Sequence, residues 1–280
     1  MKPPEVVAIL GVGLIGGSIG LALRERGFNG RIIGIGRHRS RLRKALRLGA
    51  ITESTTSIER GVSQADLIFV CTPVDCIAQY AQQISQHAPS GAVITDVGST
   101  KGSIVAALTG KTGDVHFVGS HPLAGNEKPG VEYAVSDLFA NRTVVITPDR
   151  KTNEVAKKRI IKFWKDIGAV VVSMSTKEHD RSVAMISHMP HAVAAVLAST
   201  PTAGQLKLAA TGFADTTRIA AADVELWVQI IRDNSFEVLQ SLEIFIDNLE
   251  QVRGALEQSD YRKLRRYLKR GKQARGSLGS

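Results

Sequence analysis

The segment Gly11–Gly16 limits the possible folds more than any other part of this chain. It reads Gly-Val-Gly-Leu-Ile-Gly, follows the apolar run Val6–Leu10 and opens the helical pattern Gly17–Arg26. In a strand–turn–helix unit the first glycine permits the turn, the second admits a pyrophosphate, and the third packs the helix against the strand. The helix N-terminus adds free N–H groups that attract a phosphate. A glycine turn without a ligand is the alternative. We assign to the cofactor Gly11, Gly13, Leu14, Ile15 and Gly16.

Short apolar runs alternate with amphipathic helical patterns after this turn. Helical patterns cover Gly17–Arg26, Ser40–Leu48 and Asn153–Ile167. This alternation predicts an α/β Rossmann domain with a doubly wound, mostly parallel sheet over residues 1–175. The runs with the length and composition of buried strands are Val6–Leu10, Arg31–Gly34, Leu67–Cys71, Ala92–Asp96, His116–Gly119 and Thr143–Ile146, and Ala169–Met174 is a further apolar run.

From about Thr176 onward glycines become rarer and alanine-rich helical patterns predominate. They cover His179–Thr200, Gly204–Ala210, Glu225–Leu256 and Ser259–Gly271. We therefore expect residues 176–280 to form an all-α helical domain. Because a helix as long as Glu225–Leu256 needs cover for its apolar face, we predict a helical dimerisation domain and a homodimer.

The net charge of +10 is concentrated at the C-terminus. Eight basic residues and no acidic residue lie between Arg262 and Ser280, and subtracting these eight charges leaves only +2 for the rest of the chain. Such a segment can bind nucleic acid or an anionic surface. We prefer a solvated tail that is disordered from about residue 272, and consider a nucleic-acid partner the weaker interpretation.

The cellular compartment is predicted from the N-terminus and the cysteines. Residues 6–23 lack charges but contain five glycines and lead into a helix, so we expect neither a signal peptide nor a membrane span. Cys71 and Cys76 do not form a C-x-x-C pair, and a disulfide framework is not expected. These features favour a cytoplasmic protein.

The end of the second predicted strand indicates which dinucleotide is bound. In NAD enzymes an acidic residue about twenty residues after the glycines binds the ribose 2′-hydroxyl. Here Gly36 takes that position, followed by Arg37, Arg39 and Arg41 with Ser40 among them. Because guanidinium groups match the geometry of a phosphate, we predict NADP rather than NAD, bound through Gly36, Arg37, Arg39 and Ser40. A solvated arginine cluster is the alternative.

Four further motifs distinguish among dinucleotide-binding families. They are Asp-Val-Gly-Ser-Thr-Lys at 96–101, Gly-Ser-His-Pro-Leu-Ala-Gly-Asn-Glu at 119–127, Ser-His-Met-Pro-His at 187–191 and Phe-Ala-Asp-Thr-Thr-Arg-Ile-Ala at 213–220. In this order, the chain from Val6 to about Leu256 resembles the prephenate and arogenate dehydrogenases of tyrosine biosynthesis. The resemblance implies oxidative decarboxylation of prephenate to 4-hydroxyphenylpyruvate, or of arogenate to tyrosine, with hydride transfer to NAD(P). His191 slightly favours prephenate.

The resemblance also implies roles for single residues. His121 stands at the position of the catalytic histidine, and a neutral imidazole is suited to take the proton of the substrate hydroxyl. Ser99 matches a serine beside that hydroxyl and the nicotinamide, where it can orient the proton transfer. Arg218 matches the arginine that binds a substrate carboxylate. A loop histidine, a turn serine and a surface arginine are the alternatives.

Other positions match the family around the same site. His191 corresponds to a substrate contact, and Trp227 to a tryptophan near the substrate. Glu127 aligns with a glutamate that covers the active site in some members. Packing and a position at the rim are the alternatives for Trp227 and Glu127. Three residues match a loop that lies along the cofactor, namely Cys71, Thr72 and Pro73.

Two other enzyme classes and one non-enzymatic role remain open. A β-hydroxyacid dehydrogenase or a pyrroline-carboxylate-type reductase has the same plan of sheet and helices, but a catalytic lysine is expected where this chain has His188 and His191. These histidines share a helix face, yet no third ligand follows in an obvious pattern, so no metal is expected. A dinucleotide-sensing regulator that binds nucleic acid through its basic tail is the third possibility.

Overall fold

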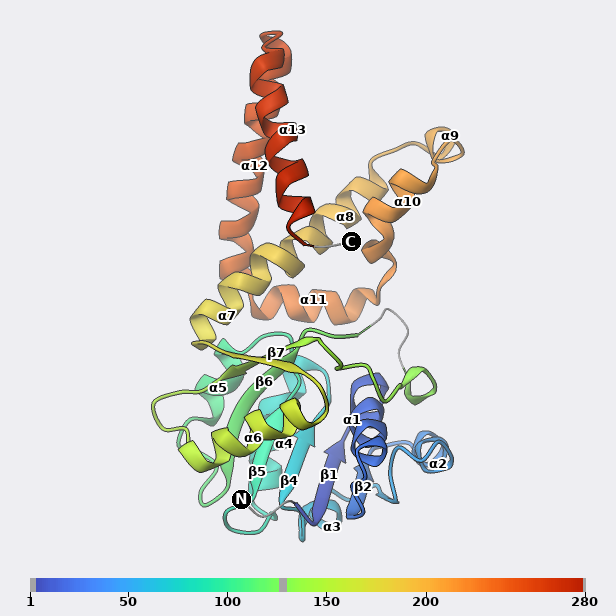
Figure 1. The fold of residues 1–280 in the computed structure, drawn as a ribbon, viewed down its shortest axis with the longest axis vertical. Helices are drawn as coiled ribbons and strands as arrows, with labels where there is room; N and C mark the ends of the chain where they lie inside the picture. The colour runs from blue at the N-terminus through green and yellow to red at the C-terminus, as the bar shows by residue number, and fades with distance from the viewer. Residues whose placement is uncertain (1–3, 126–129, 279–280) are drawn as a thin grey trace. The chain divides into compact units, whose positions relative to one another are not determined.

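The computed structural model describes residues 4–125 and 130–278 of the chain (Figure 1). It divides into two compact units, residues 1–234 and residues 235–280. The first unit contains the whole sheet and the helices up to α11, and the second contains α12 and α13. The predicted boundary between residues 175 and 176 stays a prediction.

The first unit is built on one eight-stranded sheet, with the strand order β3-β2-β1-β4-β5-β6-β7-β8. Neighbouring strands are parallel except β6 and β7, which confirms the mostly parallel, doubly wound sheet. The strands are β1 (Val6–Leu10), β2 (Arg31–Ile35), β3 (Glu53–Thr55), β4 (Leu67–Val70), β5 (Val93–Asp96), β6 (His116–Pro122), β7 (Thr143–Thr147) and β8 (Val170–Ser173).

Helices cover both faces of this sheet because successive strand residues point to opposite sides. Val7 and Phe69 belong to one core cluster, which includes Trp164 of α6. Ile68 belongs to the other cluster, together with Ile77 of α4. The first face is covered by α1 (Leu14–Glu25), α2 (Arg39–Arg47) and α6 (Glu154–Asp166), and the second by α3 (Ile58–Val62), α4 (Val74–Ser85) and α5 (Gly102–Leu108).

The helical part of the first unit follows β8 directly (Figure 1). Pro190 lies in the first turn of α8, and one π-helical turn precedes that helix. A proline has no N–H to donate to the preceding turn and its ring crowds that turn, so a wider turn fits there. The elements are α7 (Thr176–Val183), the π-helical turn η2 (Ala184–His188), α8 (Met189–Ser199), α9 (Ala203–Leu206), α10 (Thr211–Thr217), the 3₁₀ turn η3 (Arg218–Ala221) and α11 (Val224–Asp233). A further 3₁₀ turn, η1 (Val131–Tyr133), lies between β6 and β7.

Two predictions about this helical part were wrong. The helix expected over Gly204–Ala210 ends at Leu206, after a capping box between Thr202 and Gln205 that begins a short turn. The single long helix expected over Glu225–Leu256 is interrupted at Asn234, whose φ of −112° and ψ of 26° are not helical. Hydrogen bonds of the Asn234 side chain to another helix stabilise this break, and a helical periodicity cannot reveal them.

The second unit consists of α12 (Ser235–Glu257) and α13 (Tyr261–Gly276). Ser259 adopts a left-handed φ of 52° in the turn, and Asp260 then caps α13 by accepting a hydrogen bond from the Lys263 N–H at 2.9 Å. The disordered tail expected from about residue 272 was wrong as far as Gly276, since α13 continues to that residue. Lysine, glutamine, alanine and arginine at 272–275 all favour helix.

Candidate active site

The glycine turn between β1 and α1 has the shape that a pyrophosphate requires. Gly11 has a φ of +92°, and a Cβ there would lie 2.3 Å from the carbonyl oxygen of Cys71. A Cβ on Gly16 would lie 2.3 Å from the carbonyl oxygen of Gly11. A Cβ on Gly13 would meet no atom of the described residues within 4 Å. Gly11 and Gly16 are therefore needed for chain packing, whereas Gly13 leaves space above the first turn of α1 (Leu14, Ile15), which no side chain caps.

The loop after β4 lies against this turn. Thr72 Oγ1 is buried and has no hydrogen-bond partner among the described residues, so it can donate to a ligand. Burial raises the pKa of the neighbouring Cys71 thiol, which therefore stays protonated at neutral pH and is no nucleophile. Both observations fit a loop that lines a bound dinucleotide, with Pro73 ending the loop as the N-cap residue of α4.

The residues predicted to recognise the adenosine ribose surround the start of α2. Gly36 follows β2, and its N–H donates to the carbonyl of Thr55 at 3.3 Å. Arg37, Arg39 and Ser40 are exposed. The first turn of α2 has no acidic residue and no side-chain cap, so its N–H groups and the arginines form a cationic surface.

A buried carboxylate joins the two segments that carry Ser99 and His121. Asp96, the last residue of β5, accepts hydrogen bonds from the N–H of Gly98 at 2.8 Å and from the N–H of Ser120 at 3.1 Å. It also pairs with the ammonium group of Lys101, which is fully buried. The loop of Ser99 and the strand of His121 are therefore held at the same edge of the sheet.

His121 is in contact with a second histidine that the sequence did not indicate. His121 Nδ1 lies 2.8 Å from His179 Nε2, and His179 Nδ1 lies 2.7 Å from Asp180 Oδ1. Burial, followed by the nearby His179 and Lys101, lowers the pKa of His121 well below its ordinary value. The His121 imidazole is thus neutral at physiological pH and can accept a proton.

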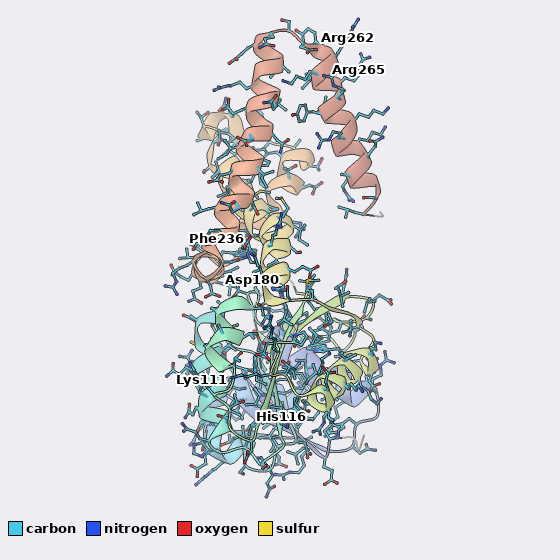
Figure 2. The ribbon with its side chains drawn as sticks, turned by 90° about the vertical axis from the view of Figure 1, so that its left-hand side faces the viewer. Lys111, His116, Asp180, Phe236, Arg262 and Arg265 are labelled. Carbon is cyan, nitrogen blue, oxygen red and sulfur yellow. The ribbon has the colours of Figure 1, made fainter. Side chains whose placement is uncertain are left out.

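Asp180 also holds the start of α5. Its two carboxylate oxygens accept hydrogen bonds from the N–H of Lys101 at 2.8 Å and from the N–H of Gly102 at 2.7 Å. Burial raises the pKa of Asp180, but the hydrogen bonds from His179, Gly102 and Lys101 outweigh it, so the net pKa is lowered and the group is ionised. Figure 2 shows Asp180 in α7, near the edge of the sheet domain.

The helices after the π-helical turn position two further histidines. His188 is buried, and its Nδ1 lies 3.1 Å from the side-chain amide of Asn234, which donates to the backbone carbonyl of Asp180 at 2.8 Å. His191 stacks on Trp227, with ring centroids 3.6 Å apart and 9° between the planes. His191 Nδ1 is buried without a hydrogen-bond partner among the described residues, so it can bind a ligand.

Two of the predicted site residues remain, Arg218 and Glu127. Arg218 is exposed and begins η3, which packs against α8, the helix of His191. Glu127 lies outside the described residues. Sequence reasoning missed His179, Asp180 and Asn234, because a histidine–aspartate pair in a polar helix and a single asparagine carry no distinctive spacing.

Comparison with known proteins shows a match over most of the chain. Two family models match, "Prephenate dehydrogenase, nucleotide-binding domain" over residues 19–173 and "Prephenate dehydrogenase, dimerization domain" over residues 175–270. A prephenate dehydrogenase of Bacillus subtilis is 36% identical, with 98% of this chain and 76% of that protein covered. A cyclohexadienyl dehydrogenase of Zymomonas mobilis is 32% identical, with 97% of this chain and 95% of that protein covered.

Among solved structures, one of high similarity is the prephenate dehydrogenase of Aquifex aeolicus in complex with hydroxyphenyl propionate and NAD⁺. It superposes with a TM-score of 0.92 at 35% sequence identity, and 99% of each chain is covered. The whole architecture of this chain is therefore shared with that enzyme.

Proposed function

This chain belongs to the prephenate dehydrogenase family, and we propose that it oxidises and decarboxylates prephenate to 4-hydroxyphenylpyruvate with NADP as the hydride acceptor. The observation that carries this proposal is the position of His121, since Asp96 holds the strand of His121 at the same sheet edge as the loop of Ser99, where burial lowers the pKa of the imidazole. The glycine turn at Gly11–Gly16 fits the dinucleotide on the neighbouring part of that edge.

His121 acts as the general base in this proposal. The dinucleotide, when bound, accepts the hydride from the carbinol carbon of the substrate. The hydroxyl on that carbon must then lose its proton, which His121 receives, and Ser99 orients the hydroxyl by hydrogen bonding. Loss of the ring carboxylate as carbon dioxide completes the aromatic ring.

The carboxylates of prephenate need cationic or hydrogen-bonding partners. Arg218 supplies a forked guanidinium that suits a carboxylate. The unpartnered Nδ1 of His191 supplies a second contact, and Trp227 fixes the plane of that ring. We assign Glu127 to the mouth of the site from its motif.

We infer NADP as the cofactor from the cationic surface of Gly36, Arg37, Arg39 and Ser40 at the start of α2. The two guanidinium groups and the helix N-terminus would attract the extra phosphate on the ribose of NADP. The free 2′-hydroxyl of NAD would lack its usual carboxylate partner. If NAD gives the higher kcat/KM, this assignment is wrong.

Steady-state kinetics with prephenate and with arogenate, each combined with NAD and NADP, test the proposed function. We expect the highest kcat/KM for prephenate with NADP. Arogenate carries an ammonium group where prephenate has a keto group, and His191 is a neutral contact that gives that charge no partner. A higher kcat/KM with arogenate would identify an arogenate dehydrogenase, and similar values would identify a cyclohexadienyl dehydrogenase.

We propose a homodimer. Large apolar side chains are exposed along α12, and the family model that covers residues 175–270 is described as a dimerization domain. Analytical ultracentrifugation at micromolar concentration should give twice the mass of the chain. The exposed apolar residues of α12 are Phe236, Leu239, Ile244, Ile246, Leu249 and Leu256.

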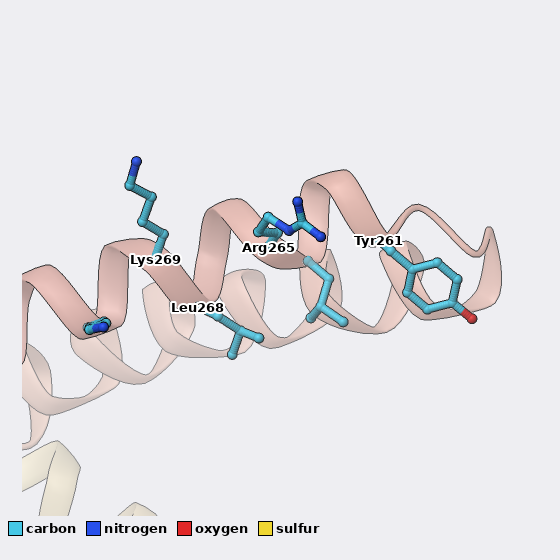
Figure 3. A pocket seen from close by; sticks show the side chains of 6 residues that line it. Tyr261, Arg265, Leu268 and Lys269 are labelled. Carbon is cyan, nitrogen blue, oxygen red and sulfur yellow. The ribbon is translucent and has the colours of Figure 1, made fainter.

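We interpret the basic surface of α13 as an ordinary solvated surface and not as a binding site. Arg262 and Arg265 point outward from this helix in Figure 2, and Figure 3 shows Tyr261, Arg265, Leu268 and Lys269 among the side chains that line a pocket on the same helix. We expect no nucleic-acid binding. A filter-binding assay with duplex DNA in low salt tests this, because phosphate contacts would give a strongly salt-dependent affinity.

We place the enzyme in the cytoplasm, where both of its cysteines remain free thiols. The segment Thr176–Ser199 is long and apolar enough to cross a membrane by length and composition. It carries buried, hydrogen-bonded polar groups, among them His179, Asp180 and His188, and we therefore assign it to the protein interior.

A further inference from the structure

A continuous series of hydrogen bonds runs from His121 into the interior of the protein. His121 keeps part of its surface exposed, whereas His179 is fully buried and Asp180 is 9% exposed. The distances are 2.8 Å between the two histidines and 2.7 Å between His179 and Asp180. The two rings meet edge to face, at an interplanar angle of 70°. Both ring nitrogens of His179 are therefore engaged.

The positions of the protons follow from the donors and acceptors. The Asp180 carboxylate already accepts hydrogen bonds from the N–H groups of Lys101 and Gly102, so it is ionised and can only accept from His179. The Nδ1 of His179 must then carry a proton. In a neutral His179 the lone pair lies on Nε2, and this nitrogen accepts the Nδ1–H of His121. The lone pair of a neutral His121 is consequently on Nε2.

We propose, on the basis of the dehydrogenase function proposed above, that His179 and Asp180 fix His121 in the tautomer with a free Nε2 and receive the proton it abstracts. The substrate hydroxyl gives its proton to His121 Nε2 while the hydride leaves to the dinucleotide. His121 passes its Nδ1 proton to His179 Nε2, and His179 becomes an imidazolium. Release of the proton through the same atoms to solvent restores the starting state.

The charges around the two histidines favour this direction of transfer. Burial disfavours a positive charge on His121, and the nearby Lys101, whose ammonium group pairs with Asp96, adds to this effect. His188 also faces this cluster, and it is uncharged at neutral pH because burial lowers its pKa to about 4. A positive charge on His179 is next to the carboxylate of Asp180. Transfer of the proton from His121 to His179 therefore moves the positive charge from a site where it is disfavoured to a site beside the Asp180 carboxylate.

The tautomers can be measured without any turnover. In protein labelled with ¹⁵N-histidine, at neutral pH and with no substrate, we expect His121 and His179 to carry a proton on Nδ1 and none on Nε2. Assignment uses the loss of one set of signals in His121→Asn and in His179→Gln. A protonated Nε2 on His121 would overturn the proposal, even if the wild-type protein oxidises prephenate.

Two variants of His179 separate orientation from proton transfer. A glutamine can accept from His121 through Oε1 and donate to Asp180 through its amide, but it cannot take a proton, so we expect kcat of His179→Gln to fall by about tenfold. A phenylalanine leaves the Nδ1–H of His121 without an acceptor. We expect kcat of His179→Phe to fall by roughly 10⁴-fold, by analogy with the wrong tautomer produced when the aspartate of a serine-protease triad is replaced by asparagine.

Proton inventories in mixtures of H₂O and D₂O give the decisive readout. We expect a curved dependence of kcat for the wild type, because two protons move, and a linear one for His179→Gln. The matched control is His188→Gln, which removes a buried histidine of the same helical segment outside the relay and should keep the curvature. Circular dichroism and NADP binding show that each variant is folded.

The possible results distinguish this proposal from the proposed function. A wild-type protein with no activity on prephenate or arogenate would contradict the function, and the tautomer measurement would still test His179 and Asp180. An active wild type whose curved inventory persists in His179→Gln, or whose kcat is unchanged in His179→Phe, would refute the relay.

Discussion

The imidazole of His191 and the indole of Trp227 are stacked, with 3.6 Å between their centroids and 9° between their planes. The two residues come from α8 and α11, so the stack fixes one helix against the other. It also leaves the unpartnered Nδ1 of His191 in a defined direction.

Replacing Trp227 should therefore affect substrate binding more than chemistry. We expect Trp227→Leu to raise KM for prephenate about fivefold with kcat lowered less than threefold, because loss of aromatic stacking costs about 1 kcal/mol. Trp227→Phe should restore most of the affinity. Substrate should quench the fluorescence of Trp227 but not that of Trp164, which is buried in the core; quenching that persists in Trp227→Phe would contradict this contact.

Arg218→Lys tests the carboxylate contact. A lysine keeps the charge but loses the fork, and truncating a desolvated charge pair costs several kcal/mol, so we expect KM to rise at least tenfold. Arg232→Lys is the matched control, because Arg232 is an exposed arginine of α11 with no assigned role. Unchanged KM and kcat in Arg218→Lys would exclude Arg218 as the anchor.

The His121→Asn variant should fold and bind NADP. Its kcat should fall by about 10²- to 10⁴-fold, which is the usual contribution of a general base. The lowered pKa of His121 makes a second statement about the wild type. Activity should stay level from neutral pH to below 6.5, and fall only at more acid pH when the imidazole is protonated. A midpoint at or above 6.5 in kcat/KM would show that His121 is not held neutral.

Alanine substitutions at two glycines of the cofactor turn should affect different properties: stability at Gly11 and NADP affinity at Gly13. Gly11→Ala places a Cβ against the carbonyl of Cys71 at a positive φ, so we expect clear loss of stability in thermal unfolding. The added Cβ of Gly13→Ala meets no atom within 4 Å in the part of the chain that the structure describes, so the free energy of unfolding should stay within about 1 kcal/mol of the wild type. NADP affinity of Gly13→Ala should nevertheless fall at least tenfold, because the methyl group occupies the space above α1. Normal NADP binding by Gly13→Ala would contradict the predicted site.

The buried His188 should make the protein sensitive to acid. Burial lowers its pKa to about 4, whereas an unfolded histidine titrates near its ordinary value of 6.5. Between these values the unfolded chain binds more protons, so the free energy of unfolding should fall as the pH drops from 6.5 to 4, by about 3 kcal/mol, and then level off. Urea unfolding at several pH values measures this, and equal slopes for the wild type and His188→Gln would contradict it.

Sequence alone predicted most of the sheet because the central strands are buried, and β8 was found from its apolar run although it is largely exposed. Val6–Leu10 and Leu67–Val70 are continuous apolar runs, and such runs occur where helices cover both faces of a sheet. The strand β3 was missed because Glu53 and Ser54 are polar and exposed at the sheet edge, where no apolar pattern is required.

The candidate site divides in the same way between local and long-range features. The glycines at 11–16 and the motif around His121 are local features, so they could be predicted from the spacing of residues in the sequence. His179 and Asp180 acquire their roles only through partners 58 and 78–79 residues away in the chain. The break at Asn234 likewise depends on bonds to Asp180 and His188 across 54 and 46 residues, which no window of sequence contains.

The π-helical turn at Ala184–His188 sets the rotational phase between two histidines of one helical segment. An α-helix advances by about 100° per residue, so one residue more or less between His179 and His191 turns the second side chain by that angle relative to the first. Straightening this turn into regular α-helix with the same number of residues would rotate His191 by about that angle, away from Trp227, whereas deleting one residue from the turn would allow a regular helix that keeps both histidines near their present directions. The wider turn thus takes up one extra residue without changing the relative direction of the helical parts that carry His179 and His191.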